Sequence, residues 1–217
     1  MHKKNRNIFN LFLCLYFVIG FYFSIKTGIT ADEIENLYSW SLNLNAIKDI
    51  FGLNDYGYKD LNEYAWKFKG VGFFYFSHLY LLAVDLFYNY DDFSPVISKI
   101  LLNHGFIFTT FFLSGLFAKK IVNLSIENNY YSNIFLIFYL SYPYLLGHGF
   151  FNTTDIPFLF GWILSTYLSI KIFLKTYRDD KISFFDIFLV ALSTAFLISV
   201  RISGILIFMQ YLIFIII

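Results

Sequence analysis

Long apolar runs are the feature that most limits how this chain can fold. A helix needs about 20 apolar residues to cross a hydrocarbon layer of roughly 30 Å. Six stretches dominated by apolar and aromatic residues approach this length: 8–25, 97–118, 130–147, 156–174, 184–200 and 202–217. The sequence therefore predicts an all-α, polytopic membrane protein with about six transmembrane helices.

Composition excludes the common alternatives to a membrane fold. Charged residues make up 14% of the chain, whereas soluble domains carry about 25%. The hydrophobic share of 58% is too high for a disordered chain. A net charge of +1 provides no basic field for nucleic acid, so we expect no nucleic-acid partner. Cys14 has no second cysteine with which to form a disulfide.

The placement of lysine and arginine predicts the orientation in the membrane. If the further apolar stretch 71–88 does not span, the segments 1–7, 119–129 and 171–183 are cytoplasmic and carry nine basic residues. If it spans, only four basic residues remain inside, against the positive-inside rule. We therefore expect 71–88 to be a juxtamembrane helix, lying in the interface within a long external loop, 26–96. His78, Asp85 and Asn89 would form its polar stripe.

Two acidic clusters are predicted to lie on the external face. Asp32 and Glu33 follow the first span, and Asp155 ends the short loop between the third and fourth spans. Taken singly, Asp155 fits a helix N-cap, and the other two fit solvated acids of a helix first turn. Taken together, two carboxylates that converge at a membrane face supply a proton acceptor and a group that orients it.

The remaining polar residues give no sign of a metal or a cofactor. His78, His104 and His148 lie on different segments without metal-ligand spacing, and no glycine-rich phosphate loop is present. We interpret His104, inside a predicted span, as a structural hydrogen-bonding residue. Arg201, at the external end of the fifth span, either binds an anionic head group or snorkels to the interface.

Three motifs occur in order along the chain and carry a resemblance to a known family. Asp32-Glu33 follows the first span, residues 142–158 read YPYLLGHGFFNTTDIPF, and Arg201 begins Arg-Ile-Ser-Gly. This pattern resembles the polyprenyl-phosphate-sugar-dependent glycosyltransferases of the GT-C class, which include the protein mannosyltransferases and the bacterial aminoarabinose transferases. The second motif is similar to the Pro, Gly-His, Asn-Pro-Lys-Asp-x-Pro pattern of many bacterial members, with Thr153-Thr154 in place of Pro-Lys.

The resemblance implies a function and a role for each matching residue. The expected activity is the transfer of a sugar from a polyprenyl-phosphate donor to a lipid, glycan or protein acceptor, by inverting displacement at the external face of a bacterial inner membrane. No metal or cofactor is expected. Asp32 is the expected base, Glu33 shapes the site beside it, and Asp155 is a second acid. The expected substrate-binding residues are His148, Asn152 and Arg201. Family members have roughly twice as many spans, so 1–217 is expected to be the N-terminal portion of one such module, truncated at its C-terminus.

Two other classes of function stay open at this point. A transporter or lipid-flippase fragment would carry acids within its spans and helices broken by Gly or Pro. Here only Asp186 lies near the start of a predicted span, while Pro143 and Pro157 lie at helix ends. A non-catalytic membrane assembly subunit would not need both external acidic clusters.

Overall fold

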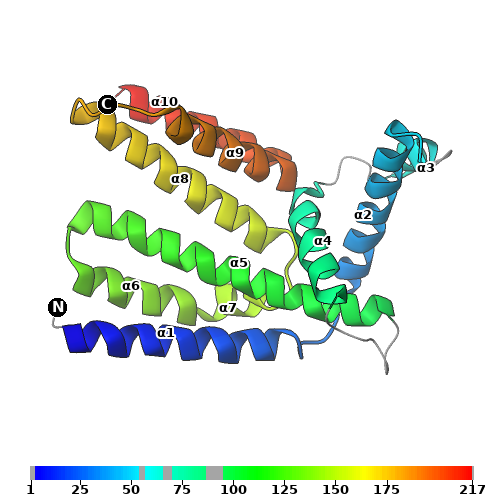
Figure 1. Ribbon diagram of the computed structural model, residues 1–217, viewed down its shortest axis with the longest axis horizontal. Coiled ribbons are helices and arrows are strands. Elements are labelled where there is room, and N and C mark those ends of the chain that lie inside the picture. The colour runs from blue at the N-terminus through cyan, green and yellow to red at the C-terminus, as the bar shows by residue number, and fades with distance from the viewer. Residues whose placement is uncertain (1–2, 54–56, 66–69, 87–94, 217) are drawn as a thin grey trace.

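The computed structural model describes residues 3–53, 57–65, 70–86 and 95–216, and every regular element among them is a helix (Figure 1). The all-α prediction is confirmed for this part of the chain. The elements are α1 (Lys3–Ser24), α2 (Ala31–Ile50), α3 (Gly57–Glu63), α4 (Gly72–Asp85), α5 (Pro95–Ile126), α6 (Asn129–Ser141), α7 (Pro143–Gly149), α8 (Asp155–Tyr177), α9 (Phe184–Val200), the 3-10 helix η1 (Ile202–Leu206) and α10 (Ile207–Ile216).

An elongated bundle forms the larger part of the molecule, and α5 lies at its centre (Figure 1). This helix packs against α1, α6 and α8, and α8 in turn packs against α9. Fully buried Phe108 and Phe111 of α5 join Leu136 of α6 in the core. α1 approaches α5 closely because Gly20 faces the ring of Phe108, where a methyl group would overlap it.

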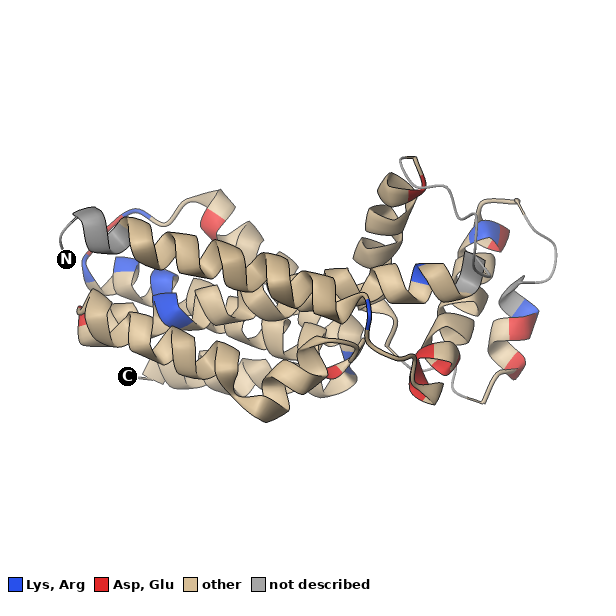
Figure 2. Cartoon of the chain, turned by 90° about the horizontal axis from the view of Figure 1, so that it is seen from below, with Lys and Arg blue, Asp and Glu red and all other residues tan. Residues whose placement is uncertain are grey.

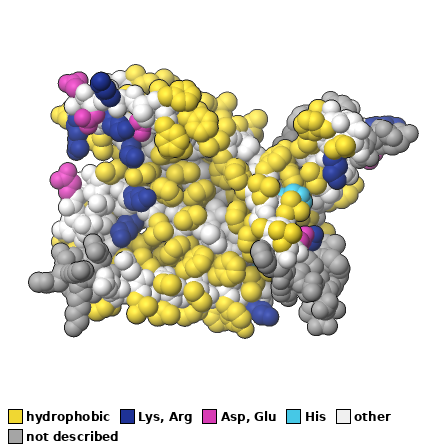
Figure 3. Space-filling model, viewed as in Figure 1, with side chains coloured by type: hydrophobic (Ala, Val, Ile, Leu, Met, Phe, Trp, Pro, Cys, Tyr) yellow, Lys and Arg dark blue, Asp and Glu magenta, His cyan; other side chains and the backbone are white. Residues whose placement is uncertain are grey.

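Within the part of the chain that the structure describes, three helices are long and apolar enough to cross a membrane: Asn7–Ser24, Ile97–Ile126 and Asp155–Tyr177. The outer face of α1 also leaves large apolar side chains such as Leu11, Leu15 and Val18 more than half exposed. Hydrophobic side chains cover much of the bundle surface seen in Figure 3. A surface of this kind fits a lipid environment better than water.

The predicted count of six spans is not confirmed. The stretch 130–147 is divided at Pro143 into α6, which at 13 residues is about 20 Å long, and the seven-residue α7. Proline has no N–H for the helix and pushes the preceding Tyr142 into an extended conformation. α9 has 17 residues, and the last apolar stretch is shared between η1 and α10. Phe184–Val200 and Ile202–Ile216 are apolar helices that are shorter than the three candidate spans.

A smaller helical unit, α2 to α4, lies at one end of the bundle (Figure 1). α4 crosses this end and packs against α5 and α9. It has 14 residues, fewer than the helices that are long enough to span, and residues 87–88 of the predicted juxtamembrane stretch lie outside the described part of the chain. Its Phe74 stacks on Trp40 of α2, with 6.1 Å between ring centroids. Asn89, the last residue of the predicted polar stripe, lies outside the described residues.

Lys and Arg residues gather at the opposite end of the bundle, where α1 begins (Figure 2). Lys119 of α5 lies 5.0 Å from the ring of Phe9 in α1. The neighbouring Lys120 shares the ring of Tyr167 in α8 with Lys171. The segments predicted to be cytoplasmic therefore meet at one end of the bundle, and the predicted external residues lie at the other.

Candidate functional site

A polar pocket of about 640 Å³ lies where α2 meets the end of the bundle. It is formed by segments far apart in the sequence, namely the first turns of α2, the segment before α4, the start of α8 and the α9–η1 junction. Its lining residues are Asp32, Asn36, Gly70, Asn152, Thr154, Asp155, Val200, Arg201, Ile202 and Ser203.

Asp155 and Arg201 form an ion pair on one side of this pocket. Nη1 of Arg201 donates to Oδ1 of Asp155, and both side chains are about half exposed, at 51% and 49%. The second oxygen of Asp155 accepts a hydrogen bond of 3.0 Å from Nδ2 of Asn152. Each oxygen of the Asp155 carboxylate therefore accepts a hydrogen bond, one from Arg201 and one from Asn152. The carboxylate does not cap α8.

Asn152 organises the start of α8. Its Oδ1 accepts from the backbone N–H groups of Thr154 at 3.0 Å and Asp155 at 2.7 Å, which fixes the orientation of the amide. The NH2 group is thus left to donate to Nδ1 of His148, 2.8 Å away. His148 also packs on the ring of Tyr144 at 4.4 Å and contributes to the site through Asn152, since it does not line the pocket.

A break in the helical path brings Arg201 to the pocket. α9 ends at Val200, and Arg201 adopts an extended backbone with φ −149° and ψ 133° before η1 begins. Gly70 packs directly against this junction, because a methyl group at that position would overlap the carbonyl oxygen of Val200. The absence of a side chain at Gly70 thus lets the chain before α4 close one wall of the pocket.

On the opposite side, α2 presents two polar residues one helical turn apart. Asn36 donates a 2.7 Å hydrogen bond from Nδ2 to Oγ1 of Thr153, and both side chains are buried. This bond fixes α2 against the loop that carries Asn152 and Asp155. Asp32 lies one turn before Asn36, is exposed and lines the pocket. Among the described residues its carboxylate has no hydrogen-bond or ion-pair partner.

Glu33 lies away from the pocket, although it is adjacent to Asp32. It is 3% exposed, and its Oε2 meets Nε2 of His104 in α5, which is fully buried. Glu33, which was expected to shape the site beside Asp32, is instead paired with His104. His104 is an ionisable residue inside an apolar run, and this placement indicates that its side chain has a polar partner. The sequence does not indicate which residue that partner is.

Glu35, the next acid along α2, is also engaged elsewhere. It accepts a hydrogen bond from the hydroxyl of Tyr64. Desolvation, together with this bond to Glu35, raises the pKa of the Tyr64 hydroxyl. Glu35 does not line the pocket.

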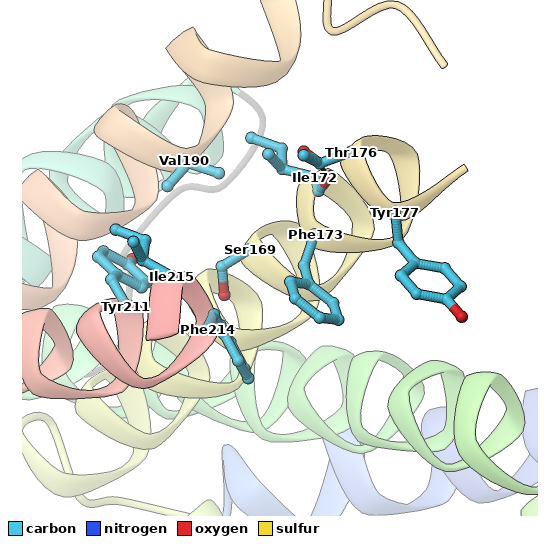
Figure 4. A pocket seen from close by; sticks show the side chains of 9 residues that line it. All are labelled: Ser169, Ile172, Phe173, Thr176, Tyr177, Val190, Tyr211, Phe214 and Ile215. Atoms are coloured by element: carbon cyan, nitrogen blue, oxygen red, sulfur yellow. Dashed lines mark hydrogen bonds between the residues drawn. The ribbon is translucent and has the colours of Figure 1, made fainter. Parts of the chain in front are cut away.

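A second cavity, of about 510 Å³, lies between α8, α9 and α10 (Figure 4). Its lining is mainly apolar, with Phe173, Phe214 and Ile215 among its residues and no ionisable group except the phenols of Tyr177 and Tyr211. It therefore offers no carboxylate for acid–base chemistry. Within the described ranges, no group of three or more His, Cys, Asp or Glu side chains is arranged to hold a metal ion.

The six site residues predicted from sequence differ in whether they line this pocket. Four of them, Asp32, Asn152, Asp155 and Arg201, line one pocket, His148 contacts it through Asn152, and Glu33 is buried nearby. Comparison with models of protein families, with curated proteins and with solved structures gives no match to this chain. The function is therefore inferred from the geometry of the pocket.

Proposed function

We propose that this chain belongs to a membrane glycosyltransferase that moves a sugar from a polyprenyl-phosphate donor to a lipid, glycan or protein acceptor. The observation that carries this proposal is the pocket in which Asp32 faces Asn152, Asp155 and Arg201 at the end of an apolar bundle. A donor with a long apolar chain and a polar head requires such a site, because its two parts need different surroundings. We place the reaction at the external face of a cell membrane, opposite the basic end.

The partners of the acidic residues support Asp32 as the base. Asp155 is engaged by Arg201 and Asn152, and Glu33 is engaged by His104. Asp32 is the member of this group that faces the pocket without a partner among the described residues. It accepts the proton of the acceptor hydroxyl as the acceptor oxygen attacks the anomeric carbon, and the phosphate leaves with the electrons of the sugar–oxygen bond. A single displacement inverts the anomeric centre.

Arg201 supplies the positive charge that a phosphate group requires. One nitrogen of its guanidinium contacts Asp155, and the other N–H groups of the fork remain to bind phosphate oxygens. Half of its side chain is exposed. Asp155 orients the guanidinium, and Asn152 in turn orients Asp155.

A decisive test is Asp32→Asn in the full-length protein, reconstituted with a polyprenyl-phosphate sugar donor. Asparagine keeps the size of the side chain but has no basic carboxylate, and a positioned base contributes about 10²–10⁴-fold. We expect kcat to fall by that order, with little change in donor KM. Glu35→Gln on the same helix is the matched control and should retain turnover. Near-normal turnover of a folded Asp32→Asn protein would disprove its role as base and make Asp155 the next candidate.

One observation favours a second candidate, a lipid flippase or transporter. The helical path is interrupted at Arg201, and the interruption lines the polar pocket. Interrupted helices around a polar site are typical of transporters. The same proteoliposomes separate the two functions, because a flippase moves the polyprenyl-phosphate sugar across the bilayer unchanged, whereas a transferase consumes it.

A further inference from the structure

The pair formed by Glu33 and His104 joins three elements at one buried point. Nδ1 of His104 lies 3.1 Å from the carbonyl oxygen of Ser24, the last residue of α1. Oε1 of Glu33 accepts from the backbone N–H and the hydroxyl of Thr30, each at 2.8 Å. The contact between Oε2 and Nε2 completes the connection from α1 through the start of α2 to α5.

The hydrogen-bond partners fix how protons are arranged in this pair. A carbonyl oxygen can only accept, so Nδ1 of His104 carries a hydrogen toward Ser24. One proton then remains between Nε2 and Oε2 of Glu33. Whichever atom holds it, the two side chains together carry no net charge. This neutrality allows the pair to be buried, since an isolated charge there would be strongly unfavourable.

The pair also determines the direction of Asp32. Successive residues of an α-helix point about 100° apart, so burying Glu33 against α5 turns Asp32 to another face. Asn36 fixes the next turn of α2 through Thr153. Two contacts therefore hold α2 in place, one made by Glu33 and one made by Asn36. The contact of Glu33 is the one next to Asp32.

We propose that Glu33 and His104 are positioning residues that hold Asp32 at the reaction distance in the pocket. This role rests on the sugar transfer proposed above. Neither side chain lines the pocket, so both act through the backbone of the first turn of α2. Breaking their contact lets that turn rotate or shift while the side of the pocket that carries Arg201 stays in place.

The first experiment measures kcat and donor KM of the full-length protein with Glu33→Leu and with His104→Leu. Misplacing a reacting group by about 1 Å lowers the rate by about 10²-fold. We expect a loss of kcat of that order, with donor KM unchanged because the Arg201 contacts persist. Glu35→Leu, the same substitution two residues further along α2, is the matched control and should leave kcat unchanged. Wild-type kcat in a folded Glu33→Leu protein would overturn the proposal.

Conservative variants separate positioning from chemistry. In Glu33→Gln the side-chain oxygen still accepts from Thr30, and the amide can donate to Nε2 of a neutral His104. We therefore expect Glu33→Gln to lose far less kcat than Glu33→Leu. His104→Gln retains a donor toward Glu33 and should likewise lose less than His104→Leu. If Glu33→Gln loses as much as Asp32→Asn, the carboxylate takes part in the chemistry and a positioning role is wrong. Should the leucine variants fail to fold, these two glutamine variants decide the question.

A readout that does not depend on activity distinguishes this proposal from the proposed function. In a Cys14→Ala background, the thiol introduced by Asp32→Cys is alkylated with a small water-soluble reagent. The alkylation rate is measured in three proteins: this Asp32→Cys protein, the same protein with His104→Gln, and the same protein with Glu33→Leu. We expect Glu33→Leu to change the alkylation rate several-fold and His104→Gln to change it less. If the wild-type protein transfers no sugar but these rates differ as expected, the proposed function fails while the positioning role stands. Equal rates in all three proteins would overturn the positioning role.

Discussion

Asp32 and Asp155 share a pocket but differ in their partners. Arg201 and Asn152 contact the two oxygens of Asp155, whereas Asp32 faces the pocket without a partner among the described residues. An acid already engaged by a cation is suited to orienting a group, and an unengaged acid is suited to accepting a proton. The chemical difference between two identical side chains thus arises from their neighbours.

At this scale, Asn152→Ala tests whether the loop before α8 sets the position of Asp155. Alanine removes the acceptor for two backbone N–H groups and the donor to Asp155. Loss of a cap of this kind costs about 0.5–2 kcal/mol, so we expect a lower Tm in detergent and reduced sugar transfer. Asn128→Ala removes the cap of α6, where Oδ1 accepts from Tyr130, and should lower Tm without affecting transfer. Equal activity in the two variants would contradict a role for Asn152 in the site.

At the scale of elements, the pocket depends on close packing between the chain before α4 and the end of α9. Gly70 and Gly72 lie so near Val200 and Ser199 that a methyl group at either glycine would overlap them. Because the nearest atom to Gly70 belongs to the backbone, a side-chain rotation cannot relieve the overlap there. α4 is thereby held against α9 beside Arg201.

We expect Gly70→Ala to push these elements apart and deform the pocket. Overpacking of this kind costs about 1–3 kcal/mol, so Tm should fall together with sugar transfer. Gly147→Ala in α7 is the matched control, because nothing lies within 4 Å of the position where its methyl group would stand. Alanine in a helix is about 0.5–1 kcal/mol better than glycine, so that variant should be as stable as the wild type or more so. An unchanged Tm in the Gly70→Ala protein would show that the junction with Val200 has room for a methyl group.

At the scale of the whole molecule, sequence predicted what depends on local composition. Apolar runs predicted where helices form. The placement of Lys and Arg predicted that the basic segments and the acidic clusters lie at opposite ends of the bundle. The pairs Glu33–His104 and Asn36–Thr153, separated by 71 and 117 residues, could not be predicted. Such contacts depend on how each helix is rotated about its axis, which apolar length does not specify. Pro143 marked the break between α6 and α7, but the continuous apolar stretch around it was interpreted as one span.

Orientation in the membrane is the property on which the shared external face depends, and cysteine labelling measures it. In a Cys14→Ala background, Gly28→Cys and Leu53→Cys should react with an impermeant reagent added to intact cells, because both follow α1 at the end of the bundle that carries the pocket. Glu127→Cys and Asp180→Cys lie in exposed connections at the basic end and should react only after permeabilisation. If α4 spans the membrane instead, every later connection changes side. Labelling of Glu127→Cys in intact cells would then place Asp32 and Asp155 on opposite faces, which is incompatible with the single pocket they line and with the transfer reaction proposed for it.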